Sequence, residues 1–126
     1  MKFFDNPIYG TYLVPNFDLF TAAVGIQFAG PHGARGIVQA ASVIIGIPPA
    51  TNPTLIRFGI DGDPDLLGSL LLLTSASARD SFVAEPDAIG NRFLLPNTTY
   101  QIDTDGVSTG STANADVAVI VAWERL

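Results

Sequence analysis

The stretch Asp116-Val117-Ala118-Val119-Ile120-Val121-Ala122-Trp123 decides the fold. Its β-branched residues favour an extended strand. Side chains of a strand point alternately to opposite faces, so the three valines share one face with Trp123. Ala118, Ile120 and Ala122 line the other face. Because both faces are apolar, the sequence predicts a strand that is buried on both sides.

The rest of the chain repeats this character in short pieces. In Gly36–Ile47, Ile45 and Ile47 alternate with Ile44 and several alanines, which predicts a second strand that is buried on both faces. Glycine, proline, asparagine and aspartate clusters separate the pieces and supply the backbone angles that turns need. The predicted strands are Tyr9–Val14, Ala22–Phe28, Gly36–Ile47, Thr54–Ile60, Leu67–Thr74, Ser81–Ala84, Arg92–Leu95, Thr98–Asp103 and Asp116–Trp123.

These strands predict an all-β protein with one sandwich or barrel domain. Nine prolines and twelve glycines are spread over 126 residues, which leaves little room for a long helix. The even spacing of the strand starts is typical of antiparallel sandwiches and barrels. Leu66–Ala78 has a helix-forming composition, and Asp65 is a candidate N-cap for that helix. Gly68 and the two strand-like neighbours nevertheless favour a strand there.

The first twenty residues are rich in aromatic side chains and are broken by Pro7 and Pro15. They are too apolar to be left in water. Two interpretations stay open: a first strand of the chain's own sandwich, or an arm that lies on a neighbouring subunit. We therefore divide the chain into residues 1–20, as arm or first strand, and residues 21–126, as the β-sandwich domain. The aromatic residues of this segment are Phe3, Phe4, Tyr9, Tyr12, Phe17 and Phe20.

Composition indicates association and excludes several kinds of site. Only 14% of the residues are charged, which is too few to cover the surface of a small monomer, so part of the surface is expected to be buried between chains. The net charge of −6 argues against nucleic-acid binding. The absence of cysteine excludes disulfides and thiolate sites. No apolar run is long enough for a signal peptide or a membrane span, so we expect a soluble chain made in the cytoplasm.

The candidate chemical sites are weak. Asp61, Asp63 and Asp65 have the alternate spacing that opens a calcium loop, but Leu66 and Leu72 occupy the positions of its glycine and glutamate. A turn is the simpler interpretation, so no metal or other cofactor is expected. His32 is the only histidine and lies in a Gly-Pro-His-Gly turn, and no nucleophile elbow is present. We therefore expect no enzyme activity.

Two other residues are interpreted as structural. Arg57 lies within the apolar segment Leu55–Ile60 and is the cation most expected to pair with a carboxylate. Trp123 shares a face with valines, which places it in the core or in an interface.

The layout of the chain resembles a known class of protein. An aromatic, proline-broken start leads into a small β domain that ends with Leu94–Ile102, a Gly/Ser/Thr-rich tip and Val117–Trp123. This resembles the small β-sandwich, jelly-roll-like virion proteins of tailed bacteriophages, in particular capsid decoration (cement) proteins. The resemblance implies a homotrimer that binds across major capsid subunits at the capsid surface after synthesis in the host cytoplasm. The implied contact residues are Phe3, Phe4, Tyr9, Tyr12, Phe17 and Phe20, and the segment Asp103–Asn114 would face outward or toward the threefold axis.

A second function stays open beside this one. A carbohydrate- or receptor-binding β-sandwich, such as a fibre head or a lectin-like module, would use Asp61, Asp63, Asp65 and Asp105 as calcium or sugar ligands. The predicted loops hold few aromatic residues for stacking on sugar rings, which counts against this alternative.

Overall fold

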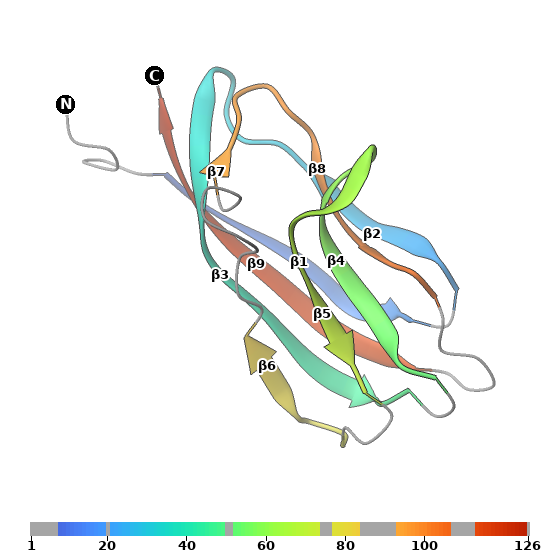
Figure 1. Cartoon of the computed structure of the whole chain (residues 1–126). Coiled ribbons are helices and arrows are strands. Elements are labelled where there is room, and N and C mark those ends of the chain that lie inside the picture. The colour runs from blue at the N-terminus through green and yellow to red at the C-terminus, as the bar shows by residue number, and fades with distance from the viewer. Residues whose placement is uncertain are drawn as a thin grey trace.

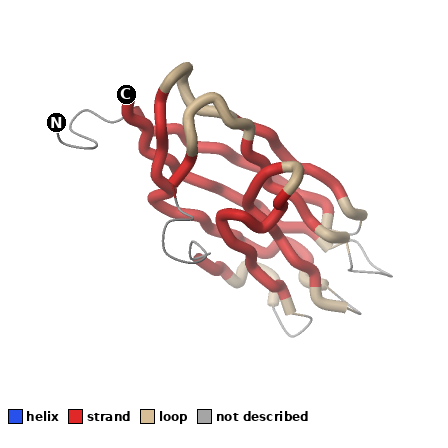
Figure 2. Tube along the Cα trace, turned by 45° about the horizontal axis from the view of Figure 1, so that its top comes forward, coloured by secondary structure: helices blue, strands red, loops and turns tan. Residues whose placement is uncertain are grey.

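A computed structural model describes residues 8–19, 21–49, 52–73, 77–83, 93–106 and 113–125. These residues form nine strands joined by turns and loops (Figures 1 and 2). No helix among them is long and apolar enough to cross a membrane. The strands are β1 (Ile8–Asp18), β2 (Ala23–Phe28), β3 (Ala34–Ile47), β4 (Thr54–Ile60), β5 (Asp63–Leu72), β6 (Ser81–Val83), β7 (Phe93–Leu94), β8 (Tyr100–Thr104) and β9 (Asn114–Arg125).

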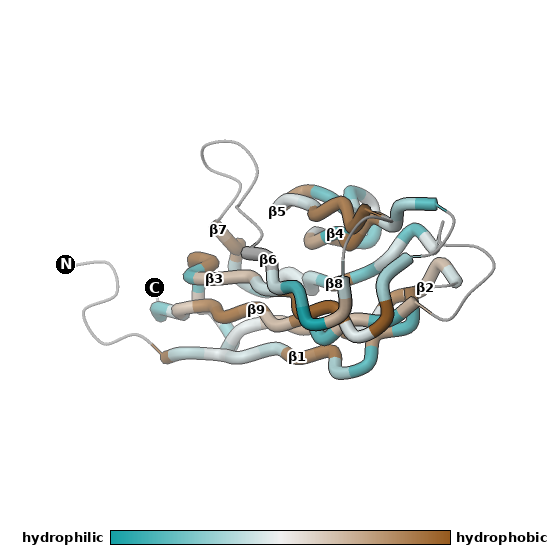
Figure 3. The backbone as a smooth tube through the Cα atoms, turned by 90° about the horizontal axis from the view of Figure 1, so that it is seen from below, coloured by the Kyte–Doolittle hydropathy of each residue, from teal (hydrophilic) through white to brown (hydrophobic). Residues whose placement is uncertain are grey.

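The strands build two antiparallel sheets that pack face to face (Figure 3). Sheet A has the order β1-β9-β3-β6, with β7 also paired to β3, and sheet B has the order β2-β8-β4-β5. The predicted all-β sandwich is thereby confirmed.

The pairing order makes this sandwich a jelly roll. β1 pairs with β9, β2 with β8, β3 with β6 and β7, and β4 with β5, so the pairs are nested along the chain. The nested ribbon then rolls up, because β9 also pairs with β3 and β8 also pairs with β4. Nested antiparallel pairs wrapped into two sheets define the jelly roll.

The core lies between the sheets and is filled by alternate residues of the central strands. β9 contributes four side chains from the face that the sequence assigned to the valines: Val117, Val119, Val121 and Trp123. Sheet B contributes Ile56 and Phe58 of β4 and Tyr100 and Ile102 of β8 to the same core. Burial of these apolar side chains is the main stabilising contribution to such a sandwich.

Trp123 is the largest buried side chain and needs small neighbours. A Cβ atom at Gly30 or Gly36 would collide with its ring, so the backbone approaches the indole closely at both positions. Two further aromatic rings lie in this part of the core: Tyr12 stacks on Phe28, with ring centroids 4.1 Å apart. β1 is thereby fastened to the core of its own chain.

Several elements differ in extent from the sequence prediction. β1 continues to Asp18 because a bulge between Val14 and Phe17 accommodates Pro15, which cannot donate to the ladder. β5 begins at Asp63, so only Asp61 and Gly62 form the turn after β4. Leu66–Leu72 is strand and not helix, as favoured, because its inward side chains complete the core beside β4.

Candidate functional site

The outward side of sheet A is the candidate site. The ladders place its side chains in rows across β1, β9 and β3: Tyr9–Ala122–Ile37, Thr11–Ile120–Ala40, and Leu13–Ala118–Ser42. Ile44 lies opposite Asp116 in the next row, and Phe93 of β7 lies opposite Ile37 on the other side of β3. Residues that stand opposite each other in a ladder share a face, so these rows form one surface, which we call the outer A face.

The outer A face is apolar and largely exposed in the single chain. Its side chains alternate with the buried core residues of the same strands, and most of them are hydrophobic. The exposed fractions of its large hydrophobic residues are 64% for Tyr9, 56% for Leu13, 47% for Ile44, 45% for Phe93 and 36% for Ile120. Contiguous apolar patches of this kind mark protein-binding surfaces. The prediction that β9 is buried on both faces was therefore wrong at Ile120 for the chain alone, although Ala122 is buried. The same prediction for Gly36–Ile47 was wrong at Ile44.

Charge on this face is sparse and compensated. Arg35 and Glu124 stand opposite each other near one end, and their side chains approach to 3.6 Å. Near the other end, a carboxylate oxygen of Asp116 accepts a hydrogen bond from the backbone N–H of Asn16 at 2.8 Å. Between these ends the rows hold aliphatic side chains, the hydroxyls of Thr11 and Ser42, and the phenol ring of Tyr9. Such a surface loses little solvation energy when another protein covers it.

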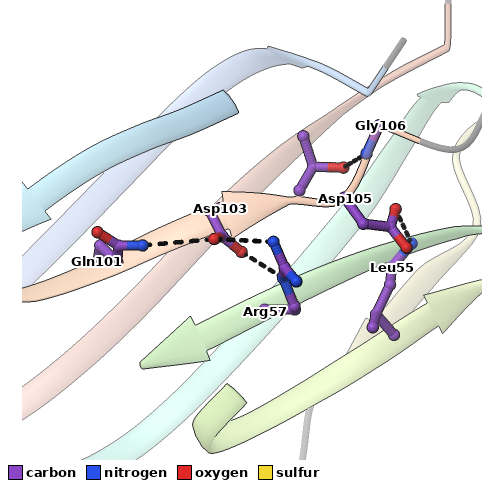
Figure 4. A network of polar contacts seen from close by, with 7 residues as sticks. Leu55, Arg57, Gln101, Asp103, Asp105 and Gly106 are labelled. Atoms are coloured by element: carbon purple, nitrogen blue, oxygen red, sulfur yellow. Dashed lines mark hydrogen bonds and ion pairs between the residues drawn. The ribbon is translucent and has the colours of Figure 1, made fainter. Parts of the chain in front are cut away.

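The outward side of sheet B is different and carries a polar network (Figure 4). Arg57 donates to both carboxylate oxygens of Asp103, from Nε at 2.7 Å and from Nη2 at 3.1 Å. Gln101 donates to the same carboxylate at 3.3 Å. This hydrogen bonding is the main reason why the pKa of Arg57 is raised above its ordinary value. The prediction that Arg57 pairs with a carboxylate is confirmed.

The neighbouring acid also has a structural role. The Asp105 carboxylate accepts a hydrogen bond from the Leu55 N–H at 3.1 Å, and the Asp105 N–H donates to the Leu55 carbonyl oxygen at 3.2 Å. These bonds join the end of β8 to β4. The contacts of Asp103 and Asp105 thus hold β4 and β8 together.

The predicted aspartate turn does not assemble a metal site in the described residues. No group of three or more histidine or acidic side chains comes together anywhere in that part of the chain. Asp63 and Asp65 do share a hydrogen bond, which raises the pKa of Asp63 above its ordinary value. His32 is exposed in the turn before β3, where the Gly33 N–H donates to the side chain of Asn97.

The implied contact residues of the first twenty positions have separate places. Tyr9 is on the outer A face, Tyr12 is half-buried, and Phe17 is 5% exposed in the chain's own core. Phe3, Phe4 and Phe20 lie outside the described residues, as does half of the segment Asp103–Asn114, residues 107–112. Sequence reasoning missed Leu13, Ile44 and Phe93 as surface residues. Ile44 had a signal, because it alternates with the buried Val43 and Ile45.

Comparison with known proteins supports the fold. No family model and no curated protein matches the chain. A chain from the capsid of Helicobacter pylori bacteriophage KHP30, described as acid-stable, is similar with a TM-score of 0.57 and 14% identity over 96% of this chain and 94% of that one. A chain from the capsid asymmetric unit of cyanophage Pam1 is similar with a TM-score of 0.55 and 17% identity over 94% and 84%. A chain from the disulfide-linked pili of Bacillus endospore appendages gives a TM-score of 0.49 and 15% identity over 95% and 89%.

Proposed function

We propose that this protein is a structural component of a bacteriophage virion, and that it acts as a capsid decoration protein. In this role it binds across major capsid subunits at the capsid surface and stabilises the shell. It does so without catalysis, through contact area alone. The observation that carries the proposal is the apolar outer A face on a jelly-roll domain. The fold shared with chains of two phage capsids supports it.

The physical argument starts from the chain's few charges. With 14% charged residues, the chain has few side chains that could keep a broad sheet face solvated. The outer A face has no ionic side chain in its central rows. A face of this kind is stable when a second protein covers it. A capsid offers many equivalent binding positions, so modest contacts repeated over linked copies give strong overall attachment.

The test uses two exposed residues that are matched in type and exposure. Ile44 is 47% exposed on the outer A face, and Val24 is 48% exposed on the outward side of sheet B, opposite Asp103. The chain is produced together with the major capsid protein encoded in the same genome, and shells are separated from unbound protein on a density gradient. We expect the wild type and Val24→Lys to migrate with the shells, and Ile44→Lys to stay unbound.

Two results would contradict the proposal. Wild-type protein that never migrates with shells would exclude the virion role, provided that the shells themselves form. Equal shell binding by Ile44→Lys and Val24→Lys, both shown to be folded by circular dichroism, would exclude the outer A face. A decoration protein further requires that shells assemble without it and melt at a higher temperature with it. Shells that fail to assemble in its absence would make it an assembly subunit instead.

The homotrimer implied by the sequence resemblance remains a prediction within this proposal. Sedimentation equilibrium of the isolated protein at micromolar concentration measures the mass directly. A threefold assembly would present three copies of the outer A face to the shell and strengthen attachment through avidity.

A further inference from the structure

β1 has an unpaired edge in the described part of the chain. It pairs with β9 along one side, and no described strand pairs with its other side. Figure 3 shows β1 at one margin of the molecule. In an antiparallel ladder, every second residue directs its N–H and C=O groups away from the paired neighbour. This edge therefore presents backbone donors and acceptors to another chain.

The exposed edge lacks the usual protection against pairing. Proteins guard edge strands with charged residues, prolines or bulges. The segment Ile8–Val14 contains no charged residue and no proline. Protection begins immediately after it, with Pro15, with Asn16 at a φ of 50°, and with the bulge before Phe17. The edge that can pair is therefore a bounded segment that ends at Val14.

We propose that the β1 edge pairs antiparallel with the β1 edge of a second copy of this chain. Centred on Thr11, the pairing places Tyr9 of one copy opposite Leu13 of the other, twice. These are the exposed large hydrophobic side chains of β1 on the outer A face, at 64% and 56%. Cross-strand pairs of an aromatic and an aliphatic residue stabilise antiparallel ladders.

Self-complementarity and charge point to a second copy as the occupant. An antiparallel pair of identical strands obeys a twofold axis, so each contact is made twice. Each copy carries a charge of −6, but the paired segments carry none. Asp61 lies in the turn before β5, Asp63 and Asp65 lie at the start of β5, and Figure 3 shows β5 and β1 at opposite margins. Edge pairing thus keeps these aspartates of the two copies apart.

Pairing would join the two copies of sheet A into one continuous sheet. Their outer A faces would then form a single surface of twice the width. The use of this surface for shell binding rests on the proposed function. A twofold contact yields dimers, so it competes with the homotrimer implied by the sequence. The mass of the isolated protein distinguishes the two.

The test uses the absence of cysteine in the natural chain. Directly opposed residues in an antiparallel pair have Cα atoms about 4.5–5.5 Å apart, which suits a disulfide. Thr11→Cys should therefore form a covalent dimer under mild oxidation. The matched control is Ala40→Cys, an exposed position in the same row of the outer A face but on β3. Failure of Thr11→Cys to cross-link, or equal cross-linking of Ala40→Cys, overturns the inference.

Lysine variants at the same two positions provide a second measurement. Thr11→Lys opposes two ammonium groups across the axis and should raise the dimer dissociation constant about tenfold or more, whereas Ala40→Lys should leave it unchanged. If both lysines dissociate the dimer, the copies associate through the outer A face and not through the edge. A wild-type monomer or trimer that still binds shells overturns the edge pairing and leaves the proposed function intact. A dimer that is cross-linked through Thr11→Cys, together with a wild type that does not bind shells, supports the edge pairing and overturns the proposed function.

Discussion

The indole Nε1 of Trp123 donates a hydrogen bond to the Oη of Tyr12 at 3.0 Å. The two residues are 111 positions apart and lie on adjacent strands of sheet A. Their bond satisfies the one polar group of the largest buried side chain. It also explains why β1, the segment whose place was open in the sequence, belongs to the chain's own sandwich.

The bond between Trp123 and Tyr12 can be removed with little change in shape. Tyr12→Phe keeps the stacking on Phe28 but leaves the indole N–H without an acceptor. We expect the free energy of unfolding in urea to fall by about 1–2 kcal/mol. Trp123 is the only tryptophan, so its fluorescence reports unfolding directly. Tyr9→Phe, at an exposed position of the same strand, should change stability by less than about 0.5 kcal/mol. Equal losses in both variants would contradict a stabilising role for this bond.

The ion pair between Arg57 and Asp103 should stabilise sheet B. Asp103→Asn removes the charge from a buried carboxylate to which Arg57 and Gln101 both donate hydrogen bonds. We expect a loss of about 1.5–3 kcal/mol, because both charged hydrogen bonds from Arg57 are weakened and a partly buried guanidinium is left without its counter-charge. The exposed Asp61→Asn is the control and should be close to neutral.

A double-mutant cycle separates this pair from the general effect of substitution. Arg57→Met, Asp103→Asn and the combined variant are compared in urea unfolding. The combined variant should be more stable than the sum of the two single losses predicts, since each single change already breaks the pair. Strict additivity would mean that Arg57 and Asp103 do not act together.

The sequence predicted the sandwich because its signal is local. Alternation in Asp116–Trp123 and Gly36–Ile47 follows directly from strand geometry, and both segments became central strands of sheet A. The pairing of Arg57 was also predictable, because a cation in an apolar strand requires a carboxylate. Its partner Asp103 was not, since a β4 residue meets a β8 residue only through the rolled topology.

The candidate site was predicted in kind but not in place. Low charge indicated a surface that is covered by other chains, yet the aromatic residues of the first twenty positions divide between core and surface. Phe17 entered the core because the bulge after Val14 changes the alternation of β1, which no single-residue preference reveals. The outer A face depends on three strands that the sheet register brings together, so Ile44 and Leu13 belong to one surface only in the folded chain.

The turn between β4 and β5 should respond to acid. The hydrogen bond that the protonated Asp63 carboxyl donates to Asp65 is the largest cause that raises the pKa of Asp63, so the folded chain holds this proton more tightly than the unfolded chain. The contribution to stability is therefore fully present below the unfolded pKa and is lost as pH rises through the folded value. Because Asp63 is exposed, the measurement is its own titration by NMR. Asp65→Ala should return the pKa of Asp63 toward its ordinary value, whereas Asp116→Ala should not change it.

The same turn depends on a close backbone approach at Gly59. A Cβ atom there would collide with the backbone carbonyl oxygens of Asp63 and Pro64, neither of which can move without disturbing the start of β5. Gly59→Ala should therefore cost about 1–3 kcal/mol of unfolding free energy through overpacking. Gly62 is the matched control in this turn, because a Cβ atom there meets nothing within 4 Å. Gly62→Ala should be near neutral, and a comparable loss in both variants would show that the turn does not lie against β4 as described.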